Sequence, residues 1–176
     1  MKCPSCGSNK YRDAKCGSCG LYLQCNSPKM SYSGEGRKRV LLVGEASGSN
    51  EDEQGLQFVG KTGQHLEKTL AKLGVDMRRD CWIVNALWCH PKHKDGNNRT
   101  PTAKEIDCCR PNILRTLREL DPDVVILLGG IPIQSVIGSL WKDKGGKGKE
   151  SATKWAGWRI PLQRPNLWIA PTFHPS

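Results

Sequence analysis

The sequence predicts an α/β fold with three layers, α/β/α, built around a four-stranded parallel sheet. Short apolar runs of strand length alternate with longer segments whose apolar residues recur at helical spacing. One of these runs, "DVVILLGG" (123–130), is apolar without interruption, as in a strand that is buried on both faces. Strands that alternate with helices favour a parallel sheet covered on both sides, which is the predicted architecture.

The expected elements follow one another after residue 38. Strands are predicted at 39–45, 81–87, 123–130 and 166–173, and 155–162 is predicted to form the arm of a hairpin. Helices are predicted at 60–74, 100–120 and 131–141, and the first of them carries Leu66, Leu70 and Leu73 at helical spacing. Pro111 is expected to kink or split the second helix, because proline lacks the N–H donor and its ring clashes with the preceding turn.

The composition divides the chain into three parts. Residues 1–30 are rich in Cys, Gly, Lys and Ser and poor in aliphatic residues, so they are expected to form a metal-binding segment without an apolar core. Residues 31–38 are expected to form a linker, and residues 39–176 the α/β domain. The overall hydrophobic content of 37% is enough for that domain to bury a core.

The sequence predicts a cytoplasmic protein without a membrane anchor. No stretch approaches the ~20 apolar residues of a membrane span, and the first residues lack the apolar region of a signal peptide. Nine cysteines in a reducing compartment favour metal ligation over disulfides.

The N-terminal cysteines form two C-x2-C-G motifs, Cys3 with Cys6 and Cys16 with Cys19. Paired motifs of this kind are typical of a zinc ribbon, but four thiolates can equally hold an iron–sulfur cluster. Further candidate ligands come later in the chain, and two cysteines, Cys81 and Cys108, are interpreted as small core residues. The remaining candidates are Cys25, Cys89 and Cys109.

The charge is strongly basic, with a formal net value of +10, and it is unevenly distributed. The segment "GEASGSNEDEQGLQFVG" (44–60) holds four acidic residues and no basic one, directly after the first predicted strand. A basic surface around an acidic loop favours a polyanion partner such as the phosphate backbone of a nucleic acid.

Several polar and aromatic residues are expected at one edge of the sheet, because ligands of parallel sheets bind at the carboxyl ends of the strands. Asn85 interrupts an apolar strand at this edge, either as a structural cap or as an amide that reads a planar ring. Phe58 is interpreted as a loop anchor or as a platform for a flat ligand. His174 follows the last predicted strand and, taken alone, fits a structural role as well as a functional one.

The motifs "GEASGSNEDEQGLQFVG", "VNALWC", "NNRTPTAKEIDCC", "VVILLGG" and "TFHPS" occur here in the order found in the iron–sulfur uracil-DNA glycosylases of family four, and from about residue 16 onward the chain resembles that family. The resemblance implies an enzyme that flips uracil out of DNA and hydrolyses its N-glycosidic bond, which initiates base excision repair.

The resemblance also implies roles for individual residues. Phe58 would stack on the flipped uracil, Asn85 would bind its N3 and O4 edge, and His174 would donate toward O2 as the base leaves. Glu45 and Glu51 complete the implied catalytic set, and carboxylates near the sugar would stabilise positive charge or orient water. The implied substrate-binding residues are Gly44, Ala46, Phe58, Asn98 and Ser176, with Arg99 beside them. The implied ligands of a 4Fe-4S cluster are Cys16, Cys19, Cys89 and Cys109.

The chain departs from the family pattern at several points. Ser47 replaces a proline and His90 replaces a common arginine. The family continues beyond the position of Ser176, so we expect a fragment. The motif of Cys3 and Cys6 is additional, which leaves zinc binding by these two cysteines, or Cys25 as a substitute cluster ligand, as alternatives.

Three other functions compete with uracil excision. The same fold could act on another deaminated base, the chain could be a catalytically weak DNA-binding accessory module, or a zinc ribbon could be joined to an unrelated α/β domain. The expected partner is uracil-containing DNA, replication proteins are further candidate partners, and we expect a monomer.

Overall fold

The structure is a computed structural model that describes residues 14–140, 152–162 and 167–176. Four parallel strands form the centre of one sheet in the order β2-β1-β3-β5. A fifth strand, β4, lies antiparallel at the edge beside β5. The bounds are β1 Val40–Gly44, β2 Cys81–Asn85, β3 Val124–Leu128, β4 Ile160–Leu162 and β5 Leu167–Thr172. The predicted parallel sheet and hairpin arm are thus confirmed, and the hairpin arm extends the sheet to five strands.

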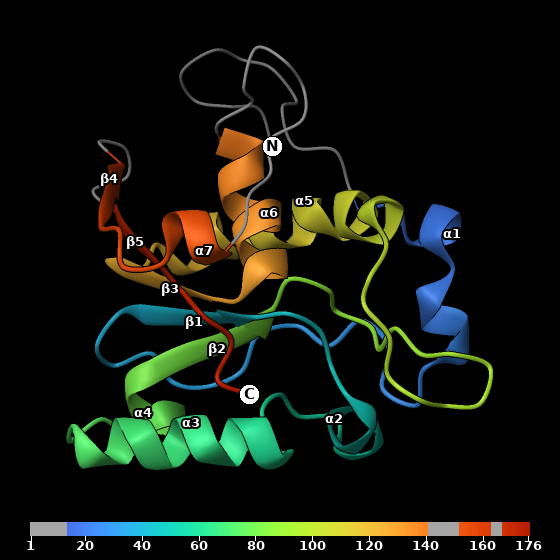
Figure 1. Cartoon of the computed structure of the whole chain (residues 1–176), viewed down its shortest axis with the longest axis horizontal. Coiled ribbons are helices and arrows are strands. Elements are labelled where there is room, and N and C mark those ends of the chain that lie inside the picture. Colours follow the sequence, from blue (N-terminus) through green and yellow to red (C-terminus); the bar gives the residue numbers. More distant parts are fainter. Residues whose placement is uncertain (1–13, 141–151, 163–166) are drawn as a thin grey trace.

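Helices cover both faces of the sheet, as the three-layer prediction requires (Figure 1). One face carries α5 (Ala103–Leu120), α6 (Gly130–Leu140) and α7 (Ala152–Trp155). The other face carries α3 (Lys61–Lys72) and α4 (Met77–Asp80), and α2 (Ser49–Gln54) lies toward the carboxyl ends of the strands. The N-terminal α1 (Cys16–Cys19) contacts α5 and is followed by a 3-10 helix, η1 (Leu21–Gln24).

Alternate side chains of the strands supply two apolar cores. Leu41 and Val43 of β1 point into the core shared with α5 and α6, whereas Leu42 points into the core shared with α3 and α4. Each such buried side chain stabilises the fold by about 1.5–3 kcal/mol relative to an exposed one. Leu73, expected on the apolar face of α3, is 74% exposed instead, because it is the C-cap residue where the helix ends.

Helix α5 runs without interruption through Pro111, so the expectation of a split is wrong. Its N-terminus is well capped: the Thr102 hydroxyl accepts from the Glu105 backbone N–H, and the Glu105 carboxylate accepts from that of Thr102. The Arg99 guanidinium also donates to both carboxylate oxygens of Glu105, at 2.9 and 2.6 Å. Burial alone would raise the pKa of Glu105, but these bonds outweigh it and lower the pKa.

The segment before β1 packs against the domain. Ser33, within the stretch expected as a linker, exchanges both backbone hydrogen bonds with Ile83 at the edge of the sheet. The Lys15 N–H donates to the carbonyl of Cys108, which ties α1 to α5. Cys3, Cys6 and the basic stretch 142–150 lie outside the described residues. Within the described ranges, no helix is both long and apolar enough to cross a membrane.

Candidate active site

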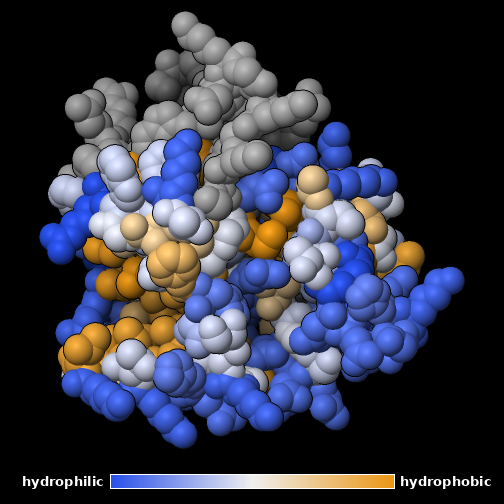
Figure 2. Space-filling view, viewed as in Figure 1, coloured by the Kyte–Doolittle hydropathy of each residue, from blue (hydrophilic) through white to orange (hydrophobic). Residues whose placement is uncertain are grey.

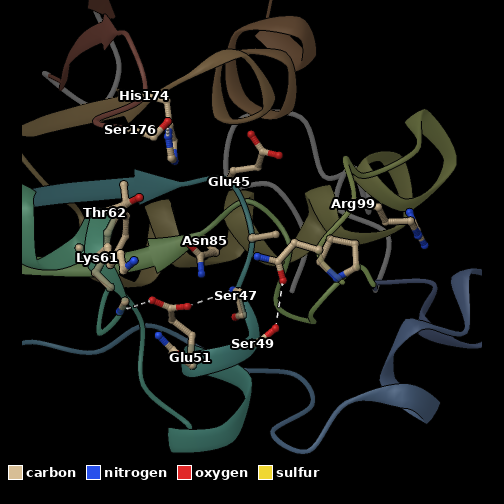
Figure 3. Close-up of a pocket in the computed structure, with 18 residues that line it drawn as sticks. Glu45, Ser47, Ser49, Glu51, Lys61, Thr62, Asn85, Arg99, His174 and Ser176 are labelled. Atoms are coloured by element: carbon tan, nitrogen blue, oxygen red, sulfur yellow. Dashed lines mark hydrogen bonds between the residues drawn. The ribbon is translucent and has the colours of Figure 1, made fainter. Parts of the chain in front are cut away.

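A cavity of about 640 Å³ opens at the carboxyl ends of the parallel strands. In Figure 2 this face of the molecule is hollowed near its centre, between hydrophilic residues. The walls come from the loop after β1, the start of α3, the end of β2 and the segment after β5 (Figure 3). The lining includes nearly all the predicted site residues, namely Glu45, Ala46, Glu51, Phe58, Asn85, Asn98, Arg99, His174 and Ser176.

Gly44, the remaining predicted residue, lies directly behind two of these side chains. It pairs with Asn85 in the register of β1 and β2. A Cβ atom at Gly44 would lie 2.4 Å from Asn85 Oδ1 and 2.5 Å from Phe58 Cζ. The absence of a side chain at Gly44 therefore lets the Asn85 amide and the Phe58 ring come together.

Phe58 is a buried ring on a strained backbone. Its φ of 56° lies in the left-handed region, which costs a residue with a side chain about 1–3 kcal/mol. The ring nevertheless lines the cavity and is only 8% exposed. Asn85, at the end of β2, is 4% exposed and lines the same cavity. The site therefore joins a flat apolar surface to an amide that can both donate and accept.

Glu51 fixes the loop that surrounds the cavity. One carboxylate oxygen accepts from the Gly48 N–H at 3.1 Å, and the other accepts from the Gly60 N–H at 2.7 Å. These bonds tie the start of α2 to the start of α3, as the dashed lines in Figure 3 show. Because both oxygens are engaged with backbone donors, the geometry favours positioning of the loop over direct proton transfer.

Glu45 and His174 interact electrostatically across the cavity. Burial raises the pKa of the half-buried Glu45 carboxyl, and its electrostatic interaction with His174 opposes that rise. His174 is exposed, and its Nδ1 lies 2.8 Å from the Ser176 hydroxyl oxygen. When that hydroxyl donates to Nδ1, the neutral imidazole carries its proton on Nε2, where it is available as a donor.

A buried polar network, which the sequence did not predict, supports one wall. His90 Nε2 lies 2.7 Å from Asn98 Oδ1, and His90 Nδ1 lies 3.3 Å from Asp52 Oδ2. The Asp52 carboxylate also accepts from the Ser27 N–H at 3.0 Å. Burial would raise the pKa of Asp52, but the backbone N–H donors and His90 outweigh it and lower the pKa. The network thereby connects the cavity wall to the N-terminal segment.

Four cysteines line a second, smaller cavity between α1, α5 and the chain after β2. They are Cys16, Cys19, Cys89 and Cys109, with Cys108 also on its wall. Cys25 does not line this cavity, although its thiol interacts with that of Cys89. Its Sγ donates to the Leu21 carbonyl at 3.2 Å and accepts from the His90 N–H at 3.2 Å. The two buried cysteines interpreted as core residues are confirmed as buried, but Cys108 also contacts this cavity.

Two of the four sulfurs accept hydrogen bonds from backbone N–H groups, as the Cys25 sulfur also does. The Lys29 N–H lies 3.4 Å from Cys89 Sγ, and the Trp88 N–H lies 3.3 Å from Cys109 Sγ. Burial, together with the neighbouring cysteines, raises the pKa of Cys89 to about 12, although the hydrogen bond from the Lys29 N–H opposes this rise. Four thiolates in this cavity would therefore need positive charge from a metal group.

The spacing of the thiols bears on the kind of metal group. A tetrahedral zinc site with bonds near 2.3 Å brings its sulfurs within about 3.8 Å of one another. Among the described residues, no three His, Cys, Asp or Glu side chains converge closely enough to hold one metal ion. Four cysteines from three segments of the chain line one cavity, and four thiolates can hold either a zinc ion or an iron–sulfur cluster.

Other cavity residues were missed by the sequence analysis. Lys61 and Thr62 line the wall at the start of α3, and Ser49 and Pro91 complete it. The glycines of "GKTG" (60–63) were the available signal, because Gly63 lets the helix approach Phe58: a Cβ there would lie 2.1 Å from the Phe58 carbonyl oxygen.

Comparison with known proteins agrees with this geometry. Residues 31–176 match the family model of the uracil DNA glycosylase superfamily. The chain is 36% identical over 172 residues to the type-4 uracil-DNA glycosylase of Thermotoga maritima, covering 94% of this chain and 78% of the relative. It is 36% identical over 137 residues to the type-4 enzyme of Pyrobaculum aerophilum, covering 77% of this chain and 59% of the relative.

A third relative is the type-4 uracil-DNA glycosylase of Saccharolobus solfataricus, at 30% identity over 164 residues, with 92% of this chain and 71% of the relative covered. The match thus extends over about three-fifths to four-fifths of the length of these relatives. The family model covers most of the chain, from the segment before β1 to the last residue. The chain belongs to the uracil-DNA glycosylase superfamily.

Proposed function

We propose that this protein is a uracil-DNA glycosylase that accepts a uracil flipped out of DNA and hydrolyses its N-glycosidic bond. The observation that carries the proposal is the meeting of Phe58, Asn85, Glu45 and His174 around one cavity at the strand ends. The names of the relatives support the same substrate. A base in a duplex is unreachable, so such an enzyme needs a cavity that reads an extruded ring.

Recognition of the base would combine stacking with hydrogen bonds. The Phe58 ring offers a flat apolar surface for the pyrimidine. The Asn85 amide has an oxygen that can accept from uracil N3–H and a nitrogen that can donate to O4. The close packing of both groups against Gly44 fixes their relative positions before the base enters. Binding therefore does not have to order these two side chains, which lowers its entropic cost.

Cleavage leaves negative charge on the uracil and positive charge on the sugar. The Nε2–H of His174, oriented by the contact of Nδ1 with Ser176, would donate toward O2 as that charge develops. The Glu45 carboxylate would face the sugar, where it would stabilise the cation or orient the attacking water. Glu51 would hold the loop, and Asn98 and Arg99 would border the substrate at the opposite wall.

We further propose that Cys16, Cys19, Cys89 and Cys109 hold a 4Fe-4S cluster. When bound, the cluster would supply a covalent link between the N-terminal segment, the chain after β2 and α5. The backbone donors of Lys29 and Trp88 would stabilise the thiolate charge. Cys25, which is bonded to η1 and His90, is not needed as a ligand in this arrangement.

The direct test of the function is incubation with an oligonucleotide that contains a single uracil, followed by alkali cleavage of abasic sites. We expect strand scission at the uracil position and none in the matched thymine oligonucleotide. Hypoxanthine in place of uracil tests the alternative base. Binding without scission at high enzyme concentration would contradict the proposal and favour the DNA-binding accessory module.

The pH dependence of the single-turnover rate should show the ionisation of the Glu45 carboxyl. Its carboxyl must be ionised to stabilise the sugar cation, and burial raises its pKa from the usual 4.5. The single-turnover rate should therefore rise with pH along an acid limb displaced above pH 4.5, and Glu45→Gln should remove that limb and most of the rate. Glu53→Gln, in the same acidic segment but absent from the cavity lining, is the control. An unchanged limb in Glu45→Gln would contradict this role.

Gly44→Ala should disable the cavity without unfolding the protein. The new methyl group would meet the Asn85 amide and the Phe58 ring, so both must shift. We expect the single-turnover rate to fall at least about tenfold, as displacement of a reactive geometry by about 1 Å can cost 100-fold. Gly130→Ala is the matched control, because a Cβ at Gly130 meets nothing within 4 Å. Equal rates for the two variants would show that the close packing at Gly44 is irrelevant.

A further inference from the structure

Arg78 of α4 lies beneath the loop that carries the Phe58 ring. Its Nη2 donates to the carbonyl oxygen of Gln57 at 2.8 Å and to that of Phe58 at 3.2 Å. One guanidinium nitrogen therefore binds two successive carbonyls at the residue whose backbone has a φ of 56°. Since a left-handed residue with a side chain persists only where its surroundings fix it, these bonds are a reason why Phe58 keeps its conformation.

The remaining supports of the loop act on other atoms. Gln57 is 1% exposed and anchors the loop from the opposite side: its Nε2 donates to the Ser31 carbonyl, and its Oε1 accepts from the Ser33 hydroxyl at 2.7 Å. Gly63 leaves room for the Phe58 carbonyl. Arg78 is the charged member of this set. Its two acceptors are the carbonyl before the Phe58 nitrogen and the carbonyl after the Phe58 Cα, so it binds the backbone on both sides of this residue.

The charge of Arg78 is not used in an ion pair within the described part of the chain. Its Nη1 is buried and has no hydrogen-bond partner among the described residues. Burial lowers the pKa of Arg78, and the more distant carboxylates of Glu67 and Glu51 oppose that effect. A half-buried guanidinium with an unpaired nitrogen lowers the stability of the fold. Such a destabilising group is expected where the residue has a function.

We propose that Arg78 is a positioning residue for base recognition: it holds Phe58 in the left-handed conformation that presents the ring to the flipped base. This inference rests on the proposed function, because it assigns the ring to the uracil. Arg78 does not line the cavity and touches no substrate. Its effect passes through the two carbonyls, so it should depend on the presence of the Phe58 ring.

The test measures binding, independently of catalysis. The probe is an oligonucleotide with one 2′-fluoro-2′-deoxyuridine, which resists cleavage, and the reference is the same oligonucleotide with thymidine. The quantity is the ratio of the two Kd values. Arg78→Met should reduce this discrimination at least about fivefold, because stacking of the base on the Phe58 ring would be weakened. Arg78→Lys, which keeps the charge and can reach one carbonyl, should recover part of it.

Two comparisons distinguish positioning from general stability. Arg79→Met removes the neighbouring exposed arginine, which pairs with Asp80 at 3.4 Å, and should leave the ratio unchanged. In a Phe58→Ala background, Arg78→Met should change the ratio less than about twofold, because the two residues act as a unit. Full additivity, or an unchanged ratio in both Arg78 variants, would overturn the inference. Absence of discrimination in the parent protein would instead overturn the proposed function.

Discussion

Replacement of Asn85 by alanine should lower the single-turnover rate of uracil release by roughly 100–1,000-fold, the usual effect of removing one well-placed hydrogen-bonding group from an active site. Asn85 is 4% exposed at the end of β2 and lies against Gly44 and the cavity. Its truncation would remove the amide and leave the edge of the proposed uracil substrate without these hydrogen-bond partners. The lost hydrogen bonds raise the free energy of the complex with the flipped base, and therefore slow uracil release.

Affinity for undamaged DNA should change little in the same variant. Contacts with phosphates position the duplex and carry no information on the base, so the Kd for a thymine oligonucleotide should remain within about threefold of the parental value. Asn97→Ala is the matched control, because Asn97 is exposed, bonds to Asp95 and is absent from the cavity lining. Parental cleavage by Asn85→Ala would remove Asn85 from the recognition site. A parallel loss of rate and of affinity for undamaged DNA would indicate misfolding instead.

The sheet could be predicted because its strands are apolar on both faces and its long helices are periodic. Val43 and Leu42 point to opposite cores, so the run that contains them has no polar position. The short helices α1, α2, α4 and α7, of four to six residues each, have too few turns to show a period. Pro111 does not split α5, because the capping by Thr102 and Glu105, together with burial of Ile113, outweighs the one backbone bond that proline removes.

Asn85 and His174 could be placed at the cavity because strand ends meet at one edge, whereas most of the other lining residues were implied only by the resemblance to family four. The supports of the cavity could not be predicted, since they depend on contacts between distant segments. Arg78 and the Phe58 loop are 20 residues apart, and His90 and Asp52 are 38 apart. Nothing in the local pattern distinguishes Arg78 from Arg79, yet one binds the Phe58 carbonyl and the other is exposed. Such differences arise only from the packing of α4 against the loop.

The cysteines illustrate the same limit. The spacing of the two C-x2-C-G motifs allowed a zinc ribbon or a cluster, and Cys25 remained an alternative ligand. In the folded chain Cys16 and Cys19 line a cavity with Cys89 and Cys109, whereas the Cys25 sulfur bonds to Leu21 and His90. The resemblance to family four had implied this set of four, but the cysteine spacing alone could not, because the grouping of these residues follows from the docking of α1 against α5.

Replacement of Cys109 by alanine should therefore remove both the brown colour and the iron of anaerobically purified protein, where the parent should hold about four iron atoms per chain. Cys109 is the proposed ligand on α5, and metal binding is coupled to folding, so the soluble yield should fall as well. Cys25→Ala and Cys81→Ala remove cysteines outside the ligand set and should keep parental iron. Deletion of residues 1–10, which removes Cys3 and Cys6, should also leave the iron unchanged.

Two results would contradict this ligand set. If Cys25→Ala loses iron while Cys19→Ala retains it, Cys25 and not Cys19 is the ligand. One equivalent of zinc without iron in the parent would contradict the cluster, because four thiolates that bind one zinc ion are not available to an iron–sulfur cluster.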